Sequence, residues 1–160
     1  MYRVIILTAS DRSAAGLRED LSGPEAERMM TEAGYQVVGR KILPDEKELL
    51  SIEMKEICDN GSADLILTTG GTGFSVRDWT PEATLEIAHR QVPGISEALR
   101  AYSLGITRRA MLSRGVSVIR NRTLIINLPG SPKAVRESLE YLIPALPHGL
   151  DILTGNVTEG

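Results

Sequence analysis

The 160-residue sequence has one cysteine, two histidines and only 4% aromatic residues. The single thiol, Cys58, cannot form an internal disulfide, and it has no companion residues for a zinc cluster. The formal net charge of −3 argues against a general nucleic-acid-binding protein, whose affinity depends on neutralising phosphates. No stretch approaches the roughly 20 apolar residues of a membrane span. We therefore expect neither a nucleic-acid partner nor a membrane partner.

The beginning of the sequence also lacks the pattern of a targeting segment. The run YRVIILTA follows the first Met directly and is shorter than the charged region plus apolar core of a signal peptide. Together with the lone cysteine, which suits a reducing compartment, this predicts a cytoplasmic protein. A chain of this length, without repeats or low-complexity segments, can bury a core without disulfides or structural metal. We expect residues 1–160 to form a single domain.

Apolar runs typical of strands alternate with amphipathic segments typical of helices along most of the chain. A tight connection at Asn121-Arg122 joins two of the apolar runs and forces them to pair antiparallel. The pattern predicts an α/β fold with three layers (α/β/α) and a mostly parallel sheet with one antiparallel hairpin strand. The expected strands are 2–9, 35–43, 63–67, 116–119 and 123–128, and the expected helices are 22–34, 49–58, 81–90, 95–104 and 134–143.

Three local signals carry structural expectations of their own. Ser22 and Glu25 have the spacing of a capping box at the start of a helix. Thr80 precedes Pro81 as a candidate N-cap hydroxyl. A series of arginines predicts a local basic patch, and contact with water or a neighbouring subunit is favoured there over binding of a phosphate. These arginines are Arg108, Arg109, Arg114, Arg120 and Arg122.

The most unusual stretch is 68–84, TTGGTGFSVRDWTPEAT, which lies between a predicted strand and a predicted helix. Main-chain N–H groups of a glycine-rich loop at such a place can converge on an anion. Polar loops also follow other predicted strands, at Ser10-Asp11, at Asp45 and at 130–133. A simple turn at Ser10-Asp11 and a helix cap at Asp45 are the alternatives. Since carboxyl ends of parallel strands share one sheet edge, we expect these loops to meet.

Two known phosphate-binding motifs do not fit this stretch. Walker A requires Gly-x-x-x-x-Gly-Lys-Ser/Thr, which the sequence does not contain. The dinucleotide fingerprint requires Gly-x-Gly-x-x-Gly, and here Val76 occupies the third glycine position after Gly71 and Gly73. Small residues would still let main-chain amides approach a phosphate, and Ser131 and Lys133 offer further donors at another helix start.

Asp45 and Asp78 are the candidate metal ligands. Both follow strands at the same predicted sheet edge, and neither has a histidine or cysteine nearby in the sequence. Carboxylates alone favour a hard, oxygen-bound cation such as Mg²⁺, which is commonly held by one or two carboxylates together with substrate phosphates. This arrangement supports attack on a phosphorus atom, where positioning and charge neutralisation supply most of the rate.

Four motifs in this order carry a family resemblance. The stretch 68–84, TASDR at 8–12, LPDE at 43–46 and LPGSPKAV at 128–135 resemble the MogA/MoaB family of molybdenum-cofactor biosynthesis. The likeness covers nearly the whole chain, and it is strongest to the molybdopterin adenylyltransferase group, which includes the G domain of gephyrin. One departure is Trp79, where a small β-branched residue is expected.

The resemblance implies an enzyme that transfers AMP from Mg-ATP to the terminal phosphate of molybdopterin, with release of pyrophosphate. By the same matching, Asp45 and Asp78 bind metal and serve catalysis. The residues implied to bind nucleotide or molybdopterin are Ser10, Asp11, Gly70, Gly71, Thr72, Gly73, Gly130, Ser131 and Lys133.

The resemblance also suggests a homotrimer, with a hexamer possible, and an association with a molybdate-inserting enzyme. The alternative functions are a non-catalytic molybdopterin-binding or scaffold protein of the same fold, and a nucleotide-processing hydrolase.

Overall fold

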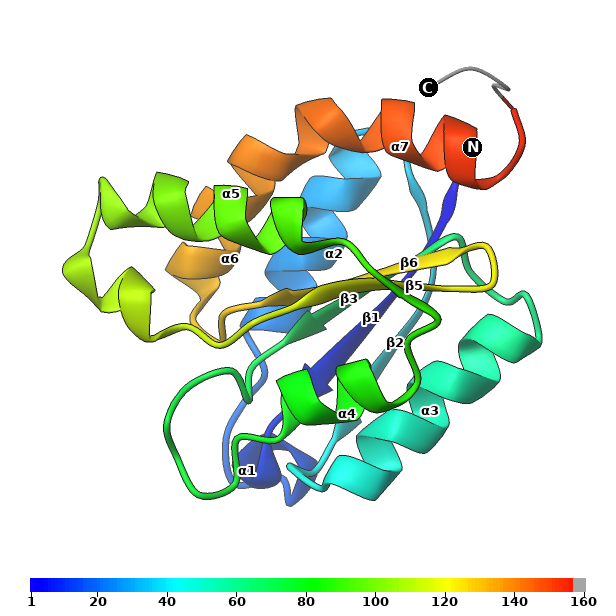
Figure 1. The fold of residues 1–160 in the computed structure, drawn as a ribbon. Coiled ribbons are helices and arrows are strands. Elements are labelled where there is room, and N and C mark those ends of the chain that lie inside the picture. The colour runs from blue at the N-terminus through cyan, green and yellow to red at the C-terminus, as the bar shows by residue number, and fades with distance from the viewer. Residues whose placement is uncertain (157–160) are drawn as a thin grey trace.

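The structure, a computed structural model, describes residues 1–156 as one six-stranded sheet with helices on both faces (Figure 1). Residues 157–160 of the expected single domain lie outside the described part. The strands are β1 (Arg3–Ala9), β2 (Gln36–Leu43), β3 (Leu65–Thr69), β4 (Arg90–Gln91), β5 (Ser117–Arg120) and β6 (Thr123–Leu128). The helices are α1 (Asp11–Ala14), α2 (Ser22–Glu32), α3 (Lys47–Asp59), α4 (Thr80–Glu86), α5 (Pro93–Leu104), α6 (Pro132–Leu142) and α7 (Leu146–Leu153), with 3-10 turns η1 (Arg108–Leu112) and η2 (Ile143–Ala145).

The strand order is β2-β1-β3-β6-β5-β4. The first four strands in that order run parallel, while β5 is antiparallel to both β6 and β4. The turn between β5 and β6 places Asn121 at a φ of 53°, the left-handed conformation that a tight hairpin requires. The mostly parallel sheet with one antiparallel hairpin strand is therefore confirmed. Strand β4 was not predicted, because its two residues are too few to show a periodic pattern.

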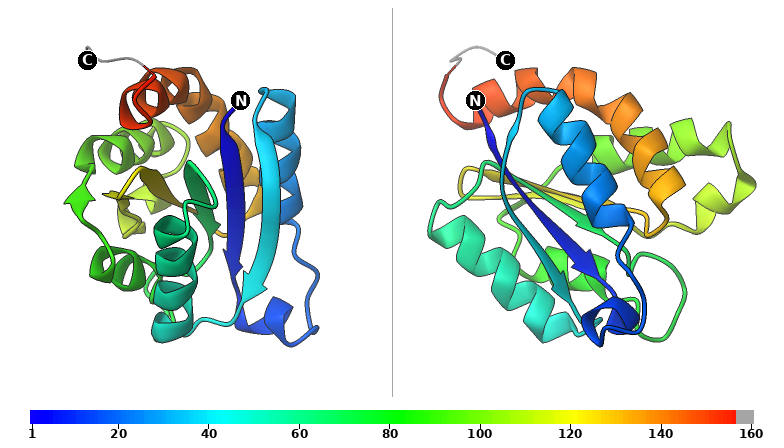
Figure 2. Two further views of the ribbon diagram at one scale, coloured as in Figure 1. Left: turned by 90° about the vertical axis from the view of Figure 1, so that its right-hand side faces the viewer. Right: turned by 180° about the vertical axis from the view of Figure 1, so that it is seen from behind.

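Two cores fill the space between the sheet and its helices. On one face α2, α5, α6 and α7 pack against apolar side chains of β1, β3 and β6. On the other face α3 and α4 pack against the alternate side chains of the same sheet. Figure 2 shows these three layers from the side and from behind. The central strands β3 and β6 are buried along their whole length, whereas β2 lies at the sheet edge and is largely exposed, as its alternating pattern predicts.

The two predicted helix caps, at Ser22 and Thr80, were wrong. The Ser22 hydroxyl donates to the carbonyl of Gly130 and does not cap α2, whose first N–H groups at Ser22 and Gly23 donate to Asp20 instead. Thr80 is the first residue of α4, and no side chain caps that helix. In residues 1–156, no helix is long and apolar enough to cross a membrane.

The five arginines do not form the single predicted patch, because three of them bind partners in different parts of the fold. Arg114 bonds with Glu82, next to the glycine-rich loop. Arg120 pairs with Asp59 at the opposite edge of the sheet, and Arg122 donates to the carbonyl of Thr154.

Candidate active site

The sheet changes its direction of winding between β1 and β3. The chain leaving β1 passes through α1 to α2 on one face, while the chain leaving β3 passes through the glycine-rich loop to α4 on the other face. These neighbouring connections diverge and leave a crevice at the carboxyl edge, where open α/β sheets bind ligands. A cavity of about 300 Å³ lies there. The predicted site residues that line it are Ser10, Asp45, Gly70, Gly71, Asp78, Gly130 and Ser131.

Asp45 is fixed by a reciprocal pair of hydrogen bonds between two strand ends. Its Oδ2 accepts from the Asp11 N–H at 2.9 Å, and Oδ1 of Asp11 accepts from the Asp45 N–H at 2.9 Å. Arg77 donates to both carboxylate oxygens of Asp11, each at 2.9 Å, and so ties the glycine-rich loop to the same place. Asp45 therefore does not cap α3, the helix that follows it, and its bonds with Asp11 at the start of α1 fix its orientation.

The second carboxylate oxygen of Asp45 has no hydrogen-bond partner. Oδ1 of Asp45 is one of three buried side-chain oxygens in residues 1–156 without a partner, with Thr80 Oγ1 and the Tyr35 hydroxyl. A buried polar atom without a partner is costly, so its presence at the edge of a cavity is expected where a ligand completes the site. The first two oxygens lie together, because a Cβ on Gly71 would come within 3.3 Å of Asp45 Oδ1 and would overlap Thr80 Oγ1.

The electrostatics of the site favour a bound cation. Burial raises the pKa of Asp45, and the negative charges of Asp11 and Asp78 act in the same direction, against the hydrogen bond from the Asp11 main chain. The pKa of Asp11 is lowered, chiefly by its hydrogen bonds with Arg77. The positive charge of Arg77 offsets only part of this effect, because the pKa of Asp45 is still raised, and a cation would relieve the remaining repulsion.

Asp78 is held by the loop that it closes. Its Oδ2 accepts from the N–H groups of Gly73 at 3.1 Å and Ser75 at 3.0 Å. A Cβ on Gly73 would lie only 3.0 Å from that oxygen, so a larger residue there would press on the Asp78 carboxylate. Asp78 also lines the cavity with Asp45, so the structure brings the two predicted metal ligands together.

The main-chain amides of the glycine-rich loop divide into two groups. The Gly70 N–H donates to the carbonyl of Leu128, and the Gly73 N–H is used by Asp78. Within the described residues, the N–H groups of Gly71 and Thr72 donate no hydrogen bond. Only these two amides of Gly70–Gly73 are therefore free to bind an anion, fewer than the sequence suggested.

The opposite wall of the cavity comes from the loop after β6 and from the segment before α2. Gly130 packs so closely on Gly70 that a Cβ would lie 3.3 Å from the Gly70 Cα. Ser131 caps α6 by accepting from the Ala134 N–H at 3.1 Å. Asp20 lines the cavity and accepts from the Thr8 hydroxyl at 2.8 Å. Asp20 was not among the predicted site residues, although an aspartate two residues before a Ser-Gly-Pro helix start is itself a capping signal.

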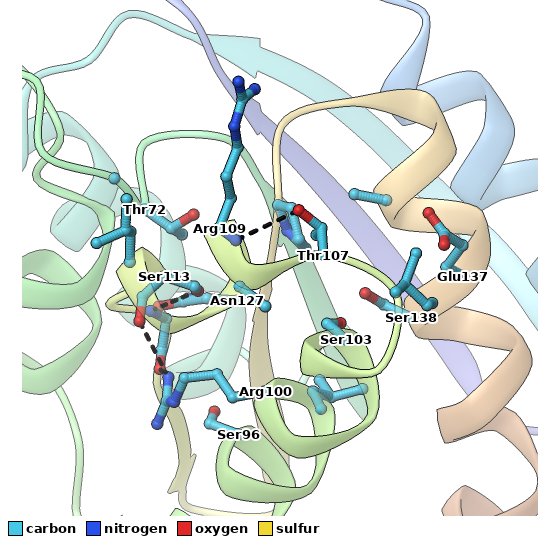
Figure 3. A pocket seen from close by; sticks show the side chains of 18 of the residues that line it. Thr72, Ser96, Arg100, Ser103, Thr107, Arg109, Ser113, Asn127, Glu137 and Ser138 are labelled. Carbon is cyan, nitrogen blue, oxygen red and sulfur yellow. Dashed lines mark hydrogen bonds between the residues drawn. The ribbon is translucent and has the colours of Figure 1, made fainter.

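Four predicted site residues do not line this cavity. Asp11 is hydrogen-bonded to Asp45 without lining the cavity itself, and Lys133 is exposed at the start of α6. Thr72 and Gly73 instead line a second, larger cavity of about 430 Å³ between α5, η1 and α6 (Figure 3). Arg100, which donates to the carbonyl of Gly115 at 2.7 Å, lies at the edge of that cavity.

The donor set fits a cation that also binds the ligand. In residues 1–156 no group of three His, Cys, Asp or Glu side chains could hold a metal ion. Asp45 and Asp78 line the same cavity and could supply two carboxylates, so the remaining ligands would have to come from substrate or water. This is the coordination that Mg²⁺ accepts in phosphate-binding enzymes.

A family model described as a probable molybdopterin binding domain matches residues 5–148. The chain belongs to this family. A molybdopterin adenylyltransferase of Helicobacter pylori is 42% identical over 156 residues, covering 96% of this chain and 89% of that protein. Gephyrin of Dictyostelium discoideum is also 42% identical, over 92% of this chain but only 22% of gephyrin.

Solved structures of the family share the whole fold. The molybdopterin biosynthesis enzyme MoaB from Thermus thermophilus has a TM-score of 0.91 and 46% identity, covering 97% of this chain and 98% of that one. A structure of MogA has a TM-score of 0.89 at 36% identity, over 94% of this chain and 99% of that one. The resemblance inferred from four sequence motifs is therefore confirmed.

Proposed function

We propose that this protein is a molybdopterin adenylyltransferase, which transfers AMP from ATP to the terminal phosphate of molybdopterin and releases pyrophosphate. One structural observation supports this most directly: Asp45 Oδ1 and Thr80 Oγ1 lie buried and unpartnered beside Gly71. Asp45 and Gly71 line the same cavity as Asp78. Several relatives at 41–42% identity carry the same name.

In this proposal an oxygen of the molybdopterin phosphate attacks the α-phosphorus of ATP. The bond from that phosphorus to the bridging oxygen breaks, and pyrophosphate leaves with the electron pair. An acceptor phosphate is already ionised at neutral pH, so the reaction requires no general base from the protein. The free N–H groups of Gly71 and Thr72 would donate to the transferring phosphate, and Ser131 and Lys133 would contact ligand from the opposite wall.

We propose Mg²⁺ as the cation, with Asp45 and Asp78 as its protein ligands. When bound, Mg²⁺ would supply positive charge against the phosphate oxygens and against the charge that develops on pyrophosphate. The protein's contribution is to hold the two carboxylates in place and to keep Thr80 Oγ1 and Asp45 Oδ1 directed to one place. The reciprocal bonds between Asp11 and Asp45 serve that purpose.

The first test is Asp78→Asn, measured as AMP transfer to molybdopterin. The variant should fold normally and lose about 10²–10³-fold in kcat, because the amide cannot contribute charge at the metal. An unfolded variant is recognised by its loss of the thermal unfolding transition. Near-normal AMP transfer by folded Asp78→Asn protein would refute the assignment of Asp78.

The same assay separates the alternative functions. Incubation with Mg-ATP is carried out with and without molybdopterin, and pyrophosphate is measured. Pyrophosphate formed only with the acceptor indicates the transferase, and pyrophosphate without it indicates a hydrolase. Absence of pyrophosphate in both indicates a binding or scaffold protein.

We further propose that the protein acts as a homotrimer in the cytoplasm, with a hexamer as the other possible assembly, and that it passes its product to a molybdate-inserting enzyme. Exposed apolar side chains gather near the larger cavity, at Phe74, Ile106, Met111 and Leu112. Such a patch is typical of an interface between subunits. Native mass measurement should therefore give about three times the 17.4 kDa of the chain, and a monomeric mass would refute this proposal.

A further inference from the structure

The loop that carries Asp78 has little packing of its own. Phe74 and Val76 are 72% and 88% exposed, so apolar burial does not hold residues 73–78 in place. Within the loop, the bonds from Gly73 and Ser75 to Asp78 fix its shape. Those bonds do not fix its position relative to the sheet, which depends on two side chains: Arg77, through its ion pair with Asp11, and Arg114.

Arg114 is the side chain that reaches both ends of this loop. Its Nε donates to the Gly73 carbonyl at 2.8 Å, and its Nη2 donates to the Asp78 carbonyl at 2.7 Å. The same guanidinium holds both carboxylate oxygens of Glu82, in the first turn of α4, at 2.6 and 3.2 Å. Its own N–H donates to the Thr72 carbonyl at 2.8 Å.

This geometry requires an arginine. A planar guanidinium presents its donors in a fixed fork, which here joins two main-chain carbonyls and one carboxylate. A lysine ammonium is a single point of charge and cannot span the same three groups. Arg114 lines neither cavity, so it does not contact the substrates in the proposed reaction.

We propose that Arg114 is a positioning residue for Asp78, setting both the affinity of the site for its cation and the rate of AMP transfer. The expected effect on rate rests on the proposed function. The expected effects on the loop and on cation binding rest only on the contacts that Arg114 makes with the loop. A shift of about 1 Å in a catalytic group can cost about a hundredfold in rate, and loss of a residue that orients a metal ligand typically weakens metal binding about 10–100-fold.

Arg120, near the amino ends of the parallel strands and far from Asp78, provides a matched control. Arg120 donates to both carboxylate oxygens of Asp59, from Nε at 2.9 Å and from Nη2 at 3.2 Å. Its Nη1 also donates to the carbonyl of Ile87 at 2.9 Å. Arg114→Ala and Arg120→Ala therefore remove similar bonds, and only the first lies next to Asp78. Arg114→Lys keeps the charge without the fork and serves if the alanine variant fails to fold.

Three measurements test the proposal. The rate of hydrogen exchange at the amides of residues 73–78 measures how well the loop is held in place. Electron paramagnetic resonance of Mn²⁺ in the presence of α,β-methylene-ATP measures the affinity of the site for the cation. Steady-state AMP transfer reports kcat and KM. Arg114→Ala should speed exchange in the loop, weaken Mn²⁺ binding about tenfold and lower kcat about a hundredfold with a smaller change in the KM of ATP. Arg114→Lys should recover only part of each loss, and Arg120→Ala should match the wild type in all three.

Wild-type exchange and wild-type Mn²⁺ binding in Arg114→Ala would overturn the inference, as would full recovery by lysine. If the wild-type protein itself transfers no AMP, the proposed function fails. Exchange and Mn²⁺ binding then still decide the role of Arg114.

Discussion

Carboxylates at the two ends of the parallel strands, here called the amino edge and the carboxyl edge, differ in how fully they are hydrogen-bonded. At the amino edge, Asp64 accepts from both the main chain and the side chain of Arg3, and Asp59 accepts from Arg120, Lys55 and Asn121. At the carboxyl edge, Asp45 keeps one buried oxygen without a partner.

The pKa values follow the same division. Hydrogen bonds with Arg120 and Lys55 hold the pKa of Asp59 well below its usual range. Burial raises the pKa of Asp45. Folding is thus supported by the ionised carboxylate at one edge and opposed by it at the other. An edge that retains such an unfavourable group is the one at which a ligand is expected to bind, because structural carboxylates have no reason to stay unpaired.

Replacing each carboxylate by its amide tests this comparison with the largest expected effect. Asp45→Asn should lower AMP transfer about 10²–10³-fold and raise the melting temperature at pH 7, because it removes a buried charge near Asp11 and Asp78. Asp59→Asn should leave AMP transfer near the wild-type rate and lower the melting temperature, because it removes a charge that Arg120 and Lys55 stabilise. Steady-state kinetics and thermal unfolding of both variants measure these changes.

The pH dependence of stability independently tests whether each ionised carboxylate stabilises or destabilises the fold. The pKa of Asp59 is lowered on folding, so its contribution to stability is present above its ordinary pKa and is lost as the pH falls through the lowered value. The pKa of Asp45 is raised, so the protein gains stability as the pH falls toward that value. The melting temperature of Asp45→Asn should therefore approach that of the wild type as the pH falls through the raised pKa of Asp45. That of Asp59→Asn should approach the wild type only at lower pH, below the ordinary pKa of an aspartate. Shifts of the same direction in both variants at pH 7 would contradict the comparison.

The sequence predicted most of the frame and the position of the site. Continuous apolar runs identified the buried strands β1, β3 and β6, and a tight turn at Asn121 identified the hairpin. Polar residues directly after strands must meet at one edge of a parallel sheet, so Asp45 and Asp78 could be placed together without coordinates. The assignment of functional roles to them remains a prediction.

The contacts that orient these residues could not be predicted from local patterns. The Ser22 hydroxyl satisfies the carbonyl of Gly130, 108 positions away, although the capping-box spacing favoured a bond within its own helix turn. Arg114 pairs with Glu82 across 32 positions, although its sequence neighbours had placed it in a basic patch facing water or a neighbouring subunit. Such partners depend on how loops from different strands pack, and no single segment carries that information.

Replacing one glycine at each edge by alanine should have a smaller effect than the aspartate substitutions. Gly71, at the carboxyl edge, and Gly61, at the amino edge, both have left-handed backbones, with φ of 68° and 64°. A Cβ on Gly61 meets nothing within 4 Å, whereas one on Gly71 would overlap Thr80 Oγ1. Gly61→Ala should lower the free energy of unfolding by about 1–2 kcal/mol, the cost of the left-handed backbone alone.

Gly71→Ala should add about 1–3 kcal/mol for overpacking to the same backbone cost. It should also reduce AMP transfer, since Thr80 and Asp45 must move apart to admit the methyl group, whereas Gly61→Ala should not. Urea unfolding and the transferase assay on both variants measure these differences. Equal losses of stability would mean that the space around Gly71 is not constrained by the two unpartnered oxygens. The contrast between the edges would then reduce to the charges of Asp45 and Asp59 alone.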